Sequence, residues 1–339
     1  MKTSNNISQA ILDRQILEAS TILLTSHINP DGDGIGSELA LYYHLSEMGK
    51  DCRIINTSKT PEVYSFLDED KVIETYSADH DEWIKKAALV IIFDIGDINR
   101  IGEMRNLFSD KSISICIDHH PARDEKVYTY TMINTEEPST GSIVYKYLIH
   151  ARNNKKLPLN IAVPLYVALI TDTGSFRYSN TNSEAHHMAA HLIESGVKPN
   201  EIQNYVYESR PMVQVKLLGK IIDGLQFQFE KQFVWFIVNS KMMSECGASH
   251  KDIDGFTDFA RTIQGVEISC MILELPDNNI RLNFRSKGKY SVNDIAGKFK
   301  GGGHPFAAGA VIENCDVRDA ENLVLEEMKS KFCGSSDVN

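Results

Sequence analysis

The sequence of 339 residues is longer than a single hydrophobic core usually spans, so two domains are expected. Its hydrophobic content of 42% and charged content of 24% are typical of a soluble globular protein. The formal net charge of -11 argues against a broad basic surface for long nucleic acid, although metals or a few arginines can still bind a phosphate locally. The N-terminus lacks the apolar core of a signal peptide, and no apolar run approaches the ~20 residues that span a bilayer. We therefore expect a cytoplasmic protein without a membrane partner.

Strands and helices alternate in the N-terminal half of the chain. Short apolar runs predict strands at 21–26, 52–56, 87–93 and 113–118. Helical periodicity predicts helices at 8–19, 39–49, 141–151, 159–170 and 183–195. This alternation indicates an α/β domain over residues 1–195, with a mostly parallel sheet flanked by helices.

The pattern breaks near Gly196, and the C-terminal half reads differently. A polar helical stretch at about 201–225 predicts a connector, which we place at 196–222. Strands are predicted at 226–238, 266–275 and 279–285, and a closing helix at 318–331. These elements predict a smaller α+β domain over residues 223–335.

Imidazole and carboxylate side chains follow the predicted strands. In an open parallel sheet, ligands bind beyond the carboxyl ends of the strands. A mixture of histidine and aspartate suits divalent manganese, iron or zinc. The residues concerned are His27, Asp31, Asp33, Asp94, Asp118, His119, His120 and, after a later helix, Asp172.

These residues are numerous enough for two metal ions, because so many carboxylates in one crevice would repel each other without cations. Two metals ~3.5–4 Å apart can drive in-line displacement at phosphorus. We assign Asp94 as the bridging carboxylate, because its strand is expected to be central. His27 and Asp31 complete one site, whereas Asp33, His119 and Asp172 complete the other.

Each of these motifs also has a plain structural interpretation. Asp-Gly-Asp-Gly is common in turns, and Asp94 and Asp172 can simply end a strand and a helix. The ordered set, rather than any single motif, therefore carries the prediction. The glycines at 32, 34 and 36 allow unusual backbone angles and let the backbone approach a ligand closely.

A second cluster of candidate residues lies near the C-terminus, in a locally basic segment. Arg285 can bind a phosphate through two hydrogen bonds, and three consecutive glycines before His304 can form an anion-binding nest of backbone N–H groups. The alternative is a flexible surface turn. Apolar residues on both sides of the glycines argue against flexibility.

Together these motifs resemble the DHH phosphoesterase superfamily over about residues 20–310. The four ordered motifs are His27-x-x-Pro-Asp31-Gly-Asp33-x-x-Gly36-Ser37, Asp94-x-x-Asp97-x-x-Arg100, Asp118-His119-His120 and Asp172-Thr-Gly. Arg285-Ser286 and Gly301-Gly302-Gly303-His304 resemble the DHHA1 substrate-binding domain of one branch. One departure is Lys300, which stands where relatives often have a further glycine and puts the substrate preference in doubt.

The resemblance implies a phosphohydrolase that uses two divalent metals, manganese above all, with magnesium or cobalt as alternatives. It gives the same metal ligands as above, with Asp94, His119 and His120 as catalytic residues; His120 would contact the scissile phosphate and protonate the leaving group. Asp118 would instead orient a histidine. The implied substrate-binding residues are Arg100, Arg285, Ser286, Gly301, Gly302, Gly303 and His304.

Other branches carry features that this sequence lacks, or lack features that it has. Inorganic pyrophosphatases lack the Gly-Gly-Gly-His module, RecJ-type exonucleases carry an extra OB-fold, and membrane-bound cyclic-dinucleotide phosphodiesterases carry transmembrane segments. The resemblance to stand-alone DHH–DHHA1 enzymes implies degradation of oligoribonucleotides of roughly two to five nucleotides to mononucleotides, removal of the 3′-phosphate of 3′-phosphoadenosine 5′-phosphate, or both.

Several alternatives stay open. The substrate can be a linear or cyclic di-adenosine nucleotide, or polyphosphate. A regulator that binds a nucleotide without hydrolysing it is the alternative that is not an enzyme. The expected partners are short RNA or nucleotides rather than long nucleic acid, and a homodimer is an open prediction.

Overall fold

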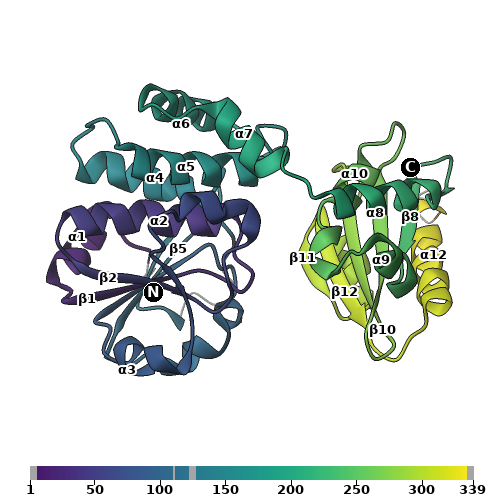
Figure 1. Cartoon of the computed structure of the whole chain (residues 1–339), viewed down its shortest axis with the longest axis horizontal. Helices are drawn as coiled ribbons and strands as arrows, with labels where there is room; N and C mark the ends of the chain where they lie inside the picture. The colour runs from purple at the N-terminus through teal and green to yellow at the C-terminus, as the bar shows by residue number, and fades with distance from the viewer. Residues whose placement is uncertain (1–5, 110, 122–126, 334–339) are drawn as a thin grey trace. The chain divides into compact units, whose positions relative to one another are not determined.

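The computed structural model describes residues 6–109, 111–121 and 127–333. The chain divides into two compact units, Met1–Ser209 and Arg210–Asn339, each described here by itself (Figure 1). The predicted connector 196–222 covers helix α7 (Pro199–Tyr207) in the first unit and most of helix α8 (Met212–Asp223) in the second. The predicted end of the second domain at residue 335 lies outside the described residues.

The first unit is built on a six-stranded sheet in the order β3-β2-β1-β4-β5-β6, in which every pairing is parallel. Its strands are β1 (Thr21–Thr25), β2 (Asp51–Asn56), β3 (Ile73–Thr75), β4 (Leu89–Phe93), β5 (Ile113–Asp118) and β6 (Tyr130–Ile133). The predicted α/β domain with a parallel sheet is confirmed. The winding reverses between the neighbours β1 and β4, where such a sheet opens a crevice at its carboxyl ends.

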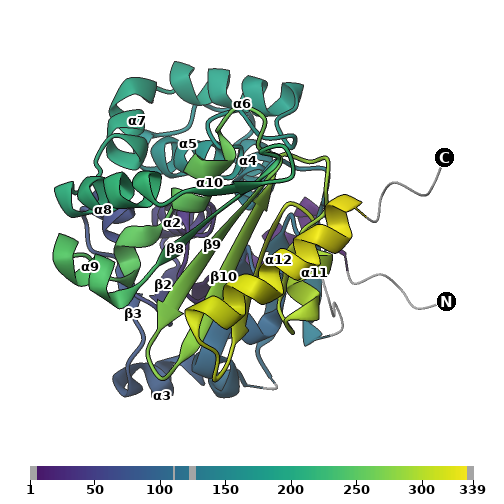
Figure 2. The same ribbon diagram turned by 90° about the vertical axis from the view of Figure 1, so that its right-hand side faces the viewer.

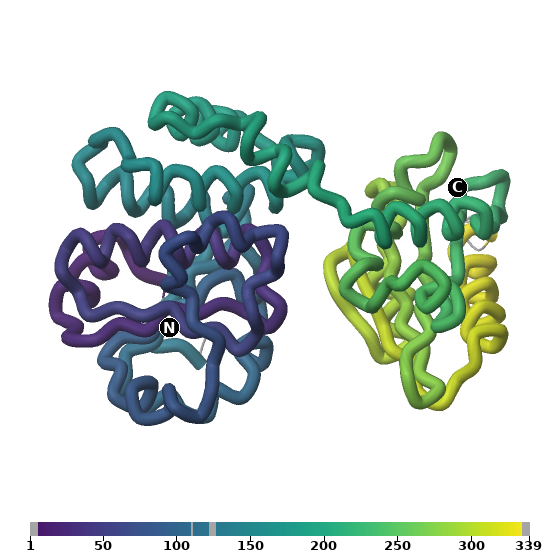
Figure 3. Tube along the Cα trace, viewed as in Figure 1, coloured from purple at the N-terminus to yellow at the C-terminus, as the bar shows by residue number. Residues whose placement is uncertain are grey.

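Helices cover both faces of this sheet. Helices α1, α2, α4 and α5 lie on one face and α3 on the other, and α6 packs outside α4 and α5 (Figures 1 and 3). Side chains of β1 alternate accordingly, because Ile22 and Leu24 join the core under α2 whereas Leu23 joins the core on the opposite face. The helices are α1 (Gln9–Glu18), α2 (Gly32–Glu47), α3 (Asp81–Ile84), α4 (Thr140–Ala151), α5 (Leu159–Asp172) and α6 (Ser183–Glu194).

Helix α2 begins seven residues earlier than predicted, so its three glycines lie in its first turns. They do not use the unusual backbone angles that glycine allows, because none of the three has a positive φ. The glycines instead leave room for neighbours. A Cβ on Gly34 would lie 2.3 Å from Ser26 Oγ, and one on Gly36 would lie 2.3 Å from the carbonyl oxygen of Pro164 in α5. Glycine is therefore required for close packing of α2 against β1 and α5.

The second unit contains a six-stranded mixed sheet in the order β11-β12-β10-β9-β8-β7, in which only β8 and β9 pair in parallel. Its strands are β7 (Gln226–Gln228), β8 (Phe233–Val238), β9 (Ile268–Leu275), β10 (Asn279–Ser286), β11 (Gly302–His304) and β12 (Ala307–Ile312). The predicted α+β character is confirmed. The single strand predicted at 226–238 is in fact a hairpin, because residues 229–231 turn through positive φ values.

Separate hydrophobic cores lie on the two faces of this sheet. Helix α12 crosses one face (Figure 2), and α8 and α10 pack on the other. The remaining helices of the unit are α9 (Ser240–Cys246), α10 (Phe256–Arg261), α11 (Asn293–Lys298) and α12 (Val317–Cys333). Within the described parts of the chain, every helix is too short or too polar to cross a membrane.

Candidate active site

The predicted metal-binding residues of the first unit lie together at the carboxyl ends of β1, β4 and β5, beside the first turn of α2 and the last residue of α5. Their potential ligand atoms form three overlapping groups, within each of which all atoms lie within 4.8 Å of one another. The groups are His27 with Asp31 and Asp94, Asp33 with His119 and Asp172, and Asp94 with His119 and His120. Parallel strands thus bring residues from distant parts of the chain to one edge of the sheet.

His27 faces two carboxylates across a short gap. Its Nε2 lies 3.8 Å from Asp31 Oδ2 and 3.7 Å from Asp94 Oδ2. Its Nδ1 lies 2.9 Å from the carbonyl oxygen of Ile28, which fits an Nδ1–H donor and leaves the lone pair of Nε2 directed at the carboxylates. Asp31 Oδ1 accepts hydrogen bonds from the N–H groups of Asp33 and Gly34 and caps α2, so its other oxygen is left for a ligand.

His119 is the counterpart of His27 on the other side of Asp94. Its Nε2 lies 3.3 Å from Asp172 Oδ2, 3.8 Å from Asp94 Oδ1 and 3.9 Å from Asp33 Oδ2. Its Nδ1 lies 3.3 Å from the carbonyl oxygen of Glu137. Nε2 is buried and has no hydrogen-bond partner among the described residues. A buried nitrogen without a partner amid carboxylates is the donor arrangement that a divalent metal satisfies.

Asp94 is the residue that both histidine groups share. Its Oδ2 faces His27 and its Oδ1 faces His119, so the carboxylate has one oxygen for each group. It adopts a left-handed backbone conformation, with φ of 54°, directly after β4. This geometry fits a carboxylate that bridges two metal ions, and the donor set of imidazoles and carboxylates fits manganese among others.

The carboxylates of this cluster are crowded enough to change their protonation. Burial raises the pKa of Asp33 well above its ordinary value, and the charges of Asp94 and Asp172 add to the effect. Burial and the charge of Asp94 likewise raise the pKa of Asp172. Asp31 shifts the other way: desolvation opposes its ionisation, but the hydrogen bond and charge of His27, together with the N–H groups of Gly34 and Asp33, lower its pKa to about 2. Cations would relieve this repulsion and keep every carboxylate ionised.

His120 is oriented by Asp118, as predicted. The Nδ1 of His120 lies 2.8 Å from Asp118 Oδ1 and 3.2 Å from Asp94 Oδ1. Asp118 Oδ2 accepts hydrogen bonds from the N–H groups of Ile95 and Gly96, which also fixes the loop after Asp94. Burial alone would lower the pKa of His120, but the two carboxylates raise it to about 11. Asp118 is not among the proposed metal ligands, so its contact favours the protonated ring of His120 and suits this residue to donate a proton.

Several residues that shape the site were not predicted. The N–H groups of Thr140 and Gly141, at the start of α4, donate to the two oxygens of Asp33 at 2.7 and 2.8 Å. Asn180 Nδ2 donates to the backbone oxygen of Asp172 and to its Oδ2, at 3.1 and 3.3 Å. Ser139, the N-cap of α4, could have indicated the first contact, but no sequence signal links Asn180 to Asp172.

Arg100 lies at the edge of this cluster. Its Nη1 donates to the carbonyl oxygen of Ile95 at 3.3 Å. Its Nη2 is 2.9 Å from His27 Nδ1, which accepts from the guanidinium only when it carries no proton; in the Nδ1–H tautomer it donates to Ile28 instead. The structure therefore places a guanidinium group beside the first histidine, where it adds positive charge.

In the second unit, the predicted phosphate-binding residues meet at one end of three neighbouring strands. Arg285 and His304 both pair with Ala307, from opposite sides of β12. Arg285 Nε donates to Asp258 Oδ2 at 3.2 Å, and its Nη1 donates to the carbonyl oxygen of Phe284. Ser286 is only 2% exposed, and its hydroxyl accepts a hydrogen bond from the N–H of Gly288.

The three glycines before His304 do not form the predicted anion-binding nest. Gly302–His304 is a strand paired with β12, and the N–H of Gly301 donates to the carbonyl oxygen of Ala296. Close contact with the backbone of β12 explains these glycines, because a Cβ on Gly301 would lie 2.1 Å from the carbonyl oxygen of Gly309. Lys300, two residues after the end of α11, has a φ of 58°, a conformation that favours glycine.

Comparison with known proteins agrees with this organisation. Residues 21–169 match the N-terminal domain of the DHH family, and residues 236–332 match the DHHA1 domain. The "bifunctional oligoribonuclease and PAP phosphatase NrnA" of Bacillus subtilis is 30% identical over 94% of this chain and 97% of its own length. The Thermus thermophilus protein of the same name is 29% identical over 92% and 90% of the two chains.

A solved structure is similar along nearly the whole chain. The crystal structure of an exopolyphosphatase-related protein from Bacteroides fragilis is 25% identical, covers 98% of this chain and 99% of its own, and superposes with a TM-score of 0.89. With the two domain matches and the relative from Bacillus subtilis, this likeness assigns the sequence: the chain belongs to the DHH family of phosphoesterases, in the branch that carries a DHHA1 domain.

Proposed function

We propose that this protein hydrolyses phosphoester bonds in short nucleotides, namely oligoribonucleotides of roughly two to five nucleotides and 3′-phosphoadenosine 5′-phosphate. The observation that carries the proposal is the pair of histidine–carboxylate groups that share Asp94. The names of the relatives, oligoribonuclease and PAP phosphatase, support this choice of substrate.

Two divalent metals, manganese above all, are proposed to be held by the shared carboxylate and the two groups around it. His27, Asp31 and Asp94 would hold one, and Asp33, Asp94, His119 and Asp172 would hold the other. When bound, such cations would lower the pKa of an attacking water and offset the charge that builds on the phosphate.

Other residues are proposed to donate a proton and to bind the substrate. His120, kept protonated by Asp118, would donate its proton to the oxygen of the leaving nucleoside. Arg100 would bind a phosphate oxygen beside the first histidine. In the second unit, Arg285, Ser286, His304 and the glycines Gly301, Gly302 and Gly303 are proposed to bind a phosphate or nucleotide group of the substrate. Binding there contributes mainly to affinity, so Arg285→Ala is expected to raise KM more than it lowers kcat.

An exopolyphosphatase is a second candidate, because the Bacteroides fragilis protein of similar structure is described as exopolyphosphatase-related. The two functions need the same metal groups but different recognition of the rest of the substrate. The cytoplasmic location and the homodimer stay predictions.

Hydrolysis assays with Mn²⁺ on purified protein test the proposal. The substrates are a 5′-phosphorylated RNA dinucleotide, a 24-mer RNA, 3′-phosphoadenosine 5′-phosphate, pApA and polyphosphate. Preference for the short nucleotides supports the proposal, and turnover of polyphosphate alone overturns the nucleotide assignment. Lack of turnover on all of them favours a nucleotide-binding regulator. Asp94→Asn should abolish turnover, whereas Asp51→Asn should not, because Asp51 lies at the opposite end of the sheet, at the start of β2.

A further inference from the structure

The segment after Asp172 forms an unusual turn. Three successive residues, Gly174, Ser175 and Phe176, have φ values of 55°, 57° and 63°. Residues other than glycine rarely adopt this backbone conformation, so the surrounding contacts must stabilise the turn. The ring of Phe176 stacks on His186 at a centroid distance of 4.9 Å, and the N–H of Ser175 donates to the carbonyl oxygen of Ile170 at 2.6 Å. The turn is therefore fixed by packing on α5 and α6.

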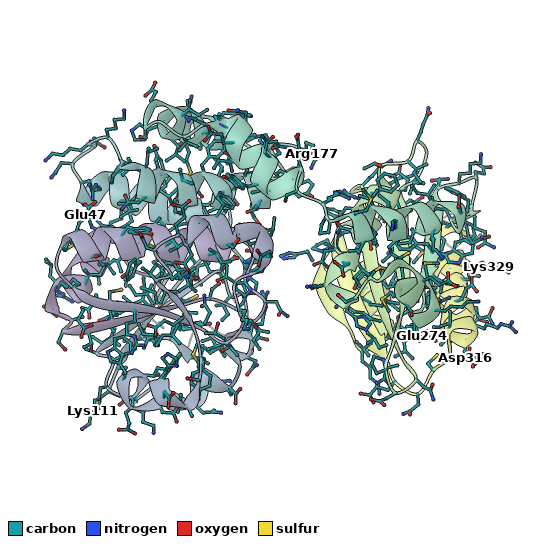
Figure 4. The ribbon with its side chains drawn as sticks, in the orientation of Figure 1. Glu47, Lys111, Arg177, Glu274, Asp316 and Lys329 are labelled. Atoms are coloured by element: carbon teal, nitrogen blue, oxygen red, sulfur yellow. The ribbon has the colours of Figure 1, made fainter. Side chains whose placement is uncertain are left out.

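This turn presents two large side chains at the surface of the first unit. The ring of Tyr178 lies against Gly174, since a Cβ on that glycine would lie 2.4 Å from Tyr178 Cζ, and yet Tyr178 is 40% exposed. Arg177 Nε donates to the carbonyl oxygen of Gly174 at 2.6 Å. Its two terminal amino groups make no hydrogen bond to the residues that the structure describes. Figure 4 shows Arg177 at the outer edge of this unit, beside α7.

The turn follows Asp172, a candidate metal ligand, and a residue after the turn contacts Asp172 again. Asn180 Nδ2 reaches back to the backbone oxygen and to the Oδ2 of Asp172. The N–H groups of Arg177 and Tyr178 both donate to the carbonyl oxygen of Thr173, the residue after Asp172, at 2.9 and 3.0 Å. An exposed aromatic ring and a fixed guanidinium group thus lie next to the residue that would hold one metal.

We propose that Arg177 and Tyr178 form a nucleotide-binding subsite of the first unit, in which Tyr178 stacks on a nucleobase and Arg177 donates to a phosphate of the same nucleotide. The proposal rests on the function proposed above and adds the recognition of the base. Stacking on an aromatic ring accepts every base, because every base has a π-face. A guanidinium group with two unpaired amino groups can bind two phosphate oxygens at once. Such a subsite favours nucleotides over polyphosphate, which has no base.

The test compares kcat/KM for a 5′-phosphorylated RNA dinucleotide with kcat/KM for the same dinucleotide lacking its bases. Tyr178→Ala should lower the first value roughly 5- to 150-fold, as for loss of one stacked base, and leave the second unchanged. Tyr178→Phe keeps the ring and should stay within about twofold of wild type. Tyr205→Ala, which removes a 51% exposed tyrosine of α7 that stacks on Phe66, is the control and should change neither value. Equal losses on both substrates, or no loss on either, would overturn the subsite.

Calorimetric binding of AMP and adenosine separates this inference from the proposed function. Tyr178→Ala should weaken the binding of both compounds, whereas Arg177→Gln should weaken only the binding of AMP. If wild type hydrolyses no nucleotide, the proposed function fails, and the subsite is then judged by these affinities alone. Affinities equal to those of wild type in both variants would show that no such subsite exists.

Discussion

Glu38 is a buried acid that forms no ion pair with the residues that the structure describes, and replacing it with a neutral side chain should make the protein more stable at high pH. The side chain lies in α2 and is 0% exposed. Its Oε1 accepts a hydrogen bond of 2.6 Å from Asn56 Nδ2, whereas its Oε2 is buried without a hydrogen-bond partner among the described residues. Burial raises the pKa of Glu38 to about 8, although the hydrogen bond from Asn56 acts in the opposite direction.

The sign and size of the effect follow from proton linkage. The folded protein holds this proton up to about pH 8, whereas the unfolded chain releases it near pH 4.5. Stability is therefore lost as the pH rises from 4.5 to 8 and stays level above that. The loss reaches at most about 5 kcal/mol above pH 8 and about 3 kcal/mol at pH 7. Glu38→Gln keeps the acceptor for Asn56 and cannot ionise, so the variant should escape this loss.

Urea unfolding between pH 5 and pH 9, with a chelator present, measures the difference. The free energies of unfolding of wild type and Glu38→Gln should be similar near pH 5 and should separate progressively up to pH 8. Other titrating groups are common to both proteins and cancel in the difference. Glu18→Gln, an exposed glutamate on α1, is the control and should show no such separation. A difference that stays constant across this pH range would refute the reasoning.

Three further predictions concern the packing and the metal site. Gly36→Ala should lower the free energy of unfolding by about 1–3 kcal/mol, because the new methyl group meets the backbone of Pro164 at 2.3 Å; a change below about 0.5 kcal/mol in urea unfolding would contradict this. Asp172→Asn should raise the thermal midpoint of the metal-free protein, because it relieves the repulsion between carboxylates. Added Mn²⁺ should stabilise wild type more than the variant, and the stabilisation of wild type should be about 2.7 kcal/mol at a hundredfold excess of metal over Kd. Equal gains in both proteins would exclude Asp172 as a ligand. Asp118→Asn should lower the pKa of His120, so the alkaline limb of the kcat–pH profile should move to lower pH; an unchanged profile would contradict the role of Asp118.

The clustering of the candidate metal ligands could be predicted from sequence wherever these residues follow strands. Parallel strands end at one edge of the sheet, so His27, Asp94 and His119 had to come together once the strands were recognised. The hydrogen-bond donors that hold these ligands in place could not be predicted in the same way. Thr140 and Asp33 are 107 residues apart, and their contact depends on how α4 packs beside α2. A pattern of apolar residues gives the existence of both helices but not the position of one helix end against the other.

The role of the glycines was the least specific prediction from the sequence, because glycine can occupy a position for two unrelated reasons. A glycine offers a free choice of φ, and it also lacks a Cβ. The glycines of α2 were interpreted by the first property, but the distance from Gly36 to the backbone of Pro164 shows that the second decides. The converse holds at Lys300, where a non-glycine residue adopts the left-handed conformation that the sequence would have reserved for glycine.

The same distinction changes how an anion would be bound in the second unit. A nest needs successive backbone N–H groups that point to one side, but the N–H of Gly301 is already bonded to Ala296, and β11 has the extended backbone of a strand. Side chains must therefore supply most of the donors. Arg285 keeps its Nη2 available while Asp258 and Phe284 accept from its other nitrogens, and His304 lies across β12 from it. Ala307 is the residue of β12 between them. If the side chains supply the donors, loss of Arg285 should cost more affinity than any change within the glycine run that preserves the strand.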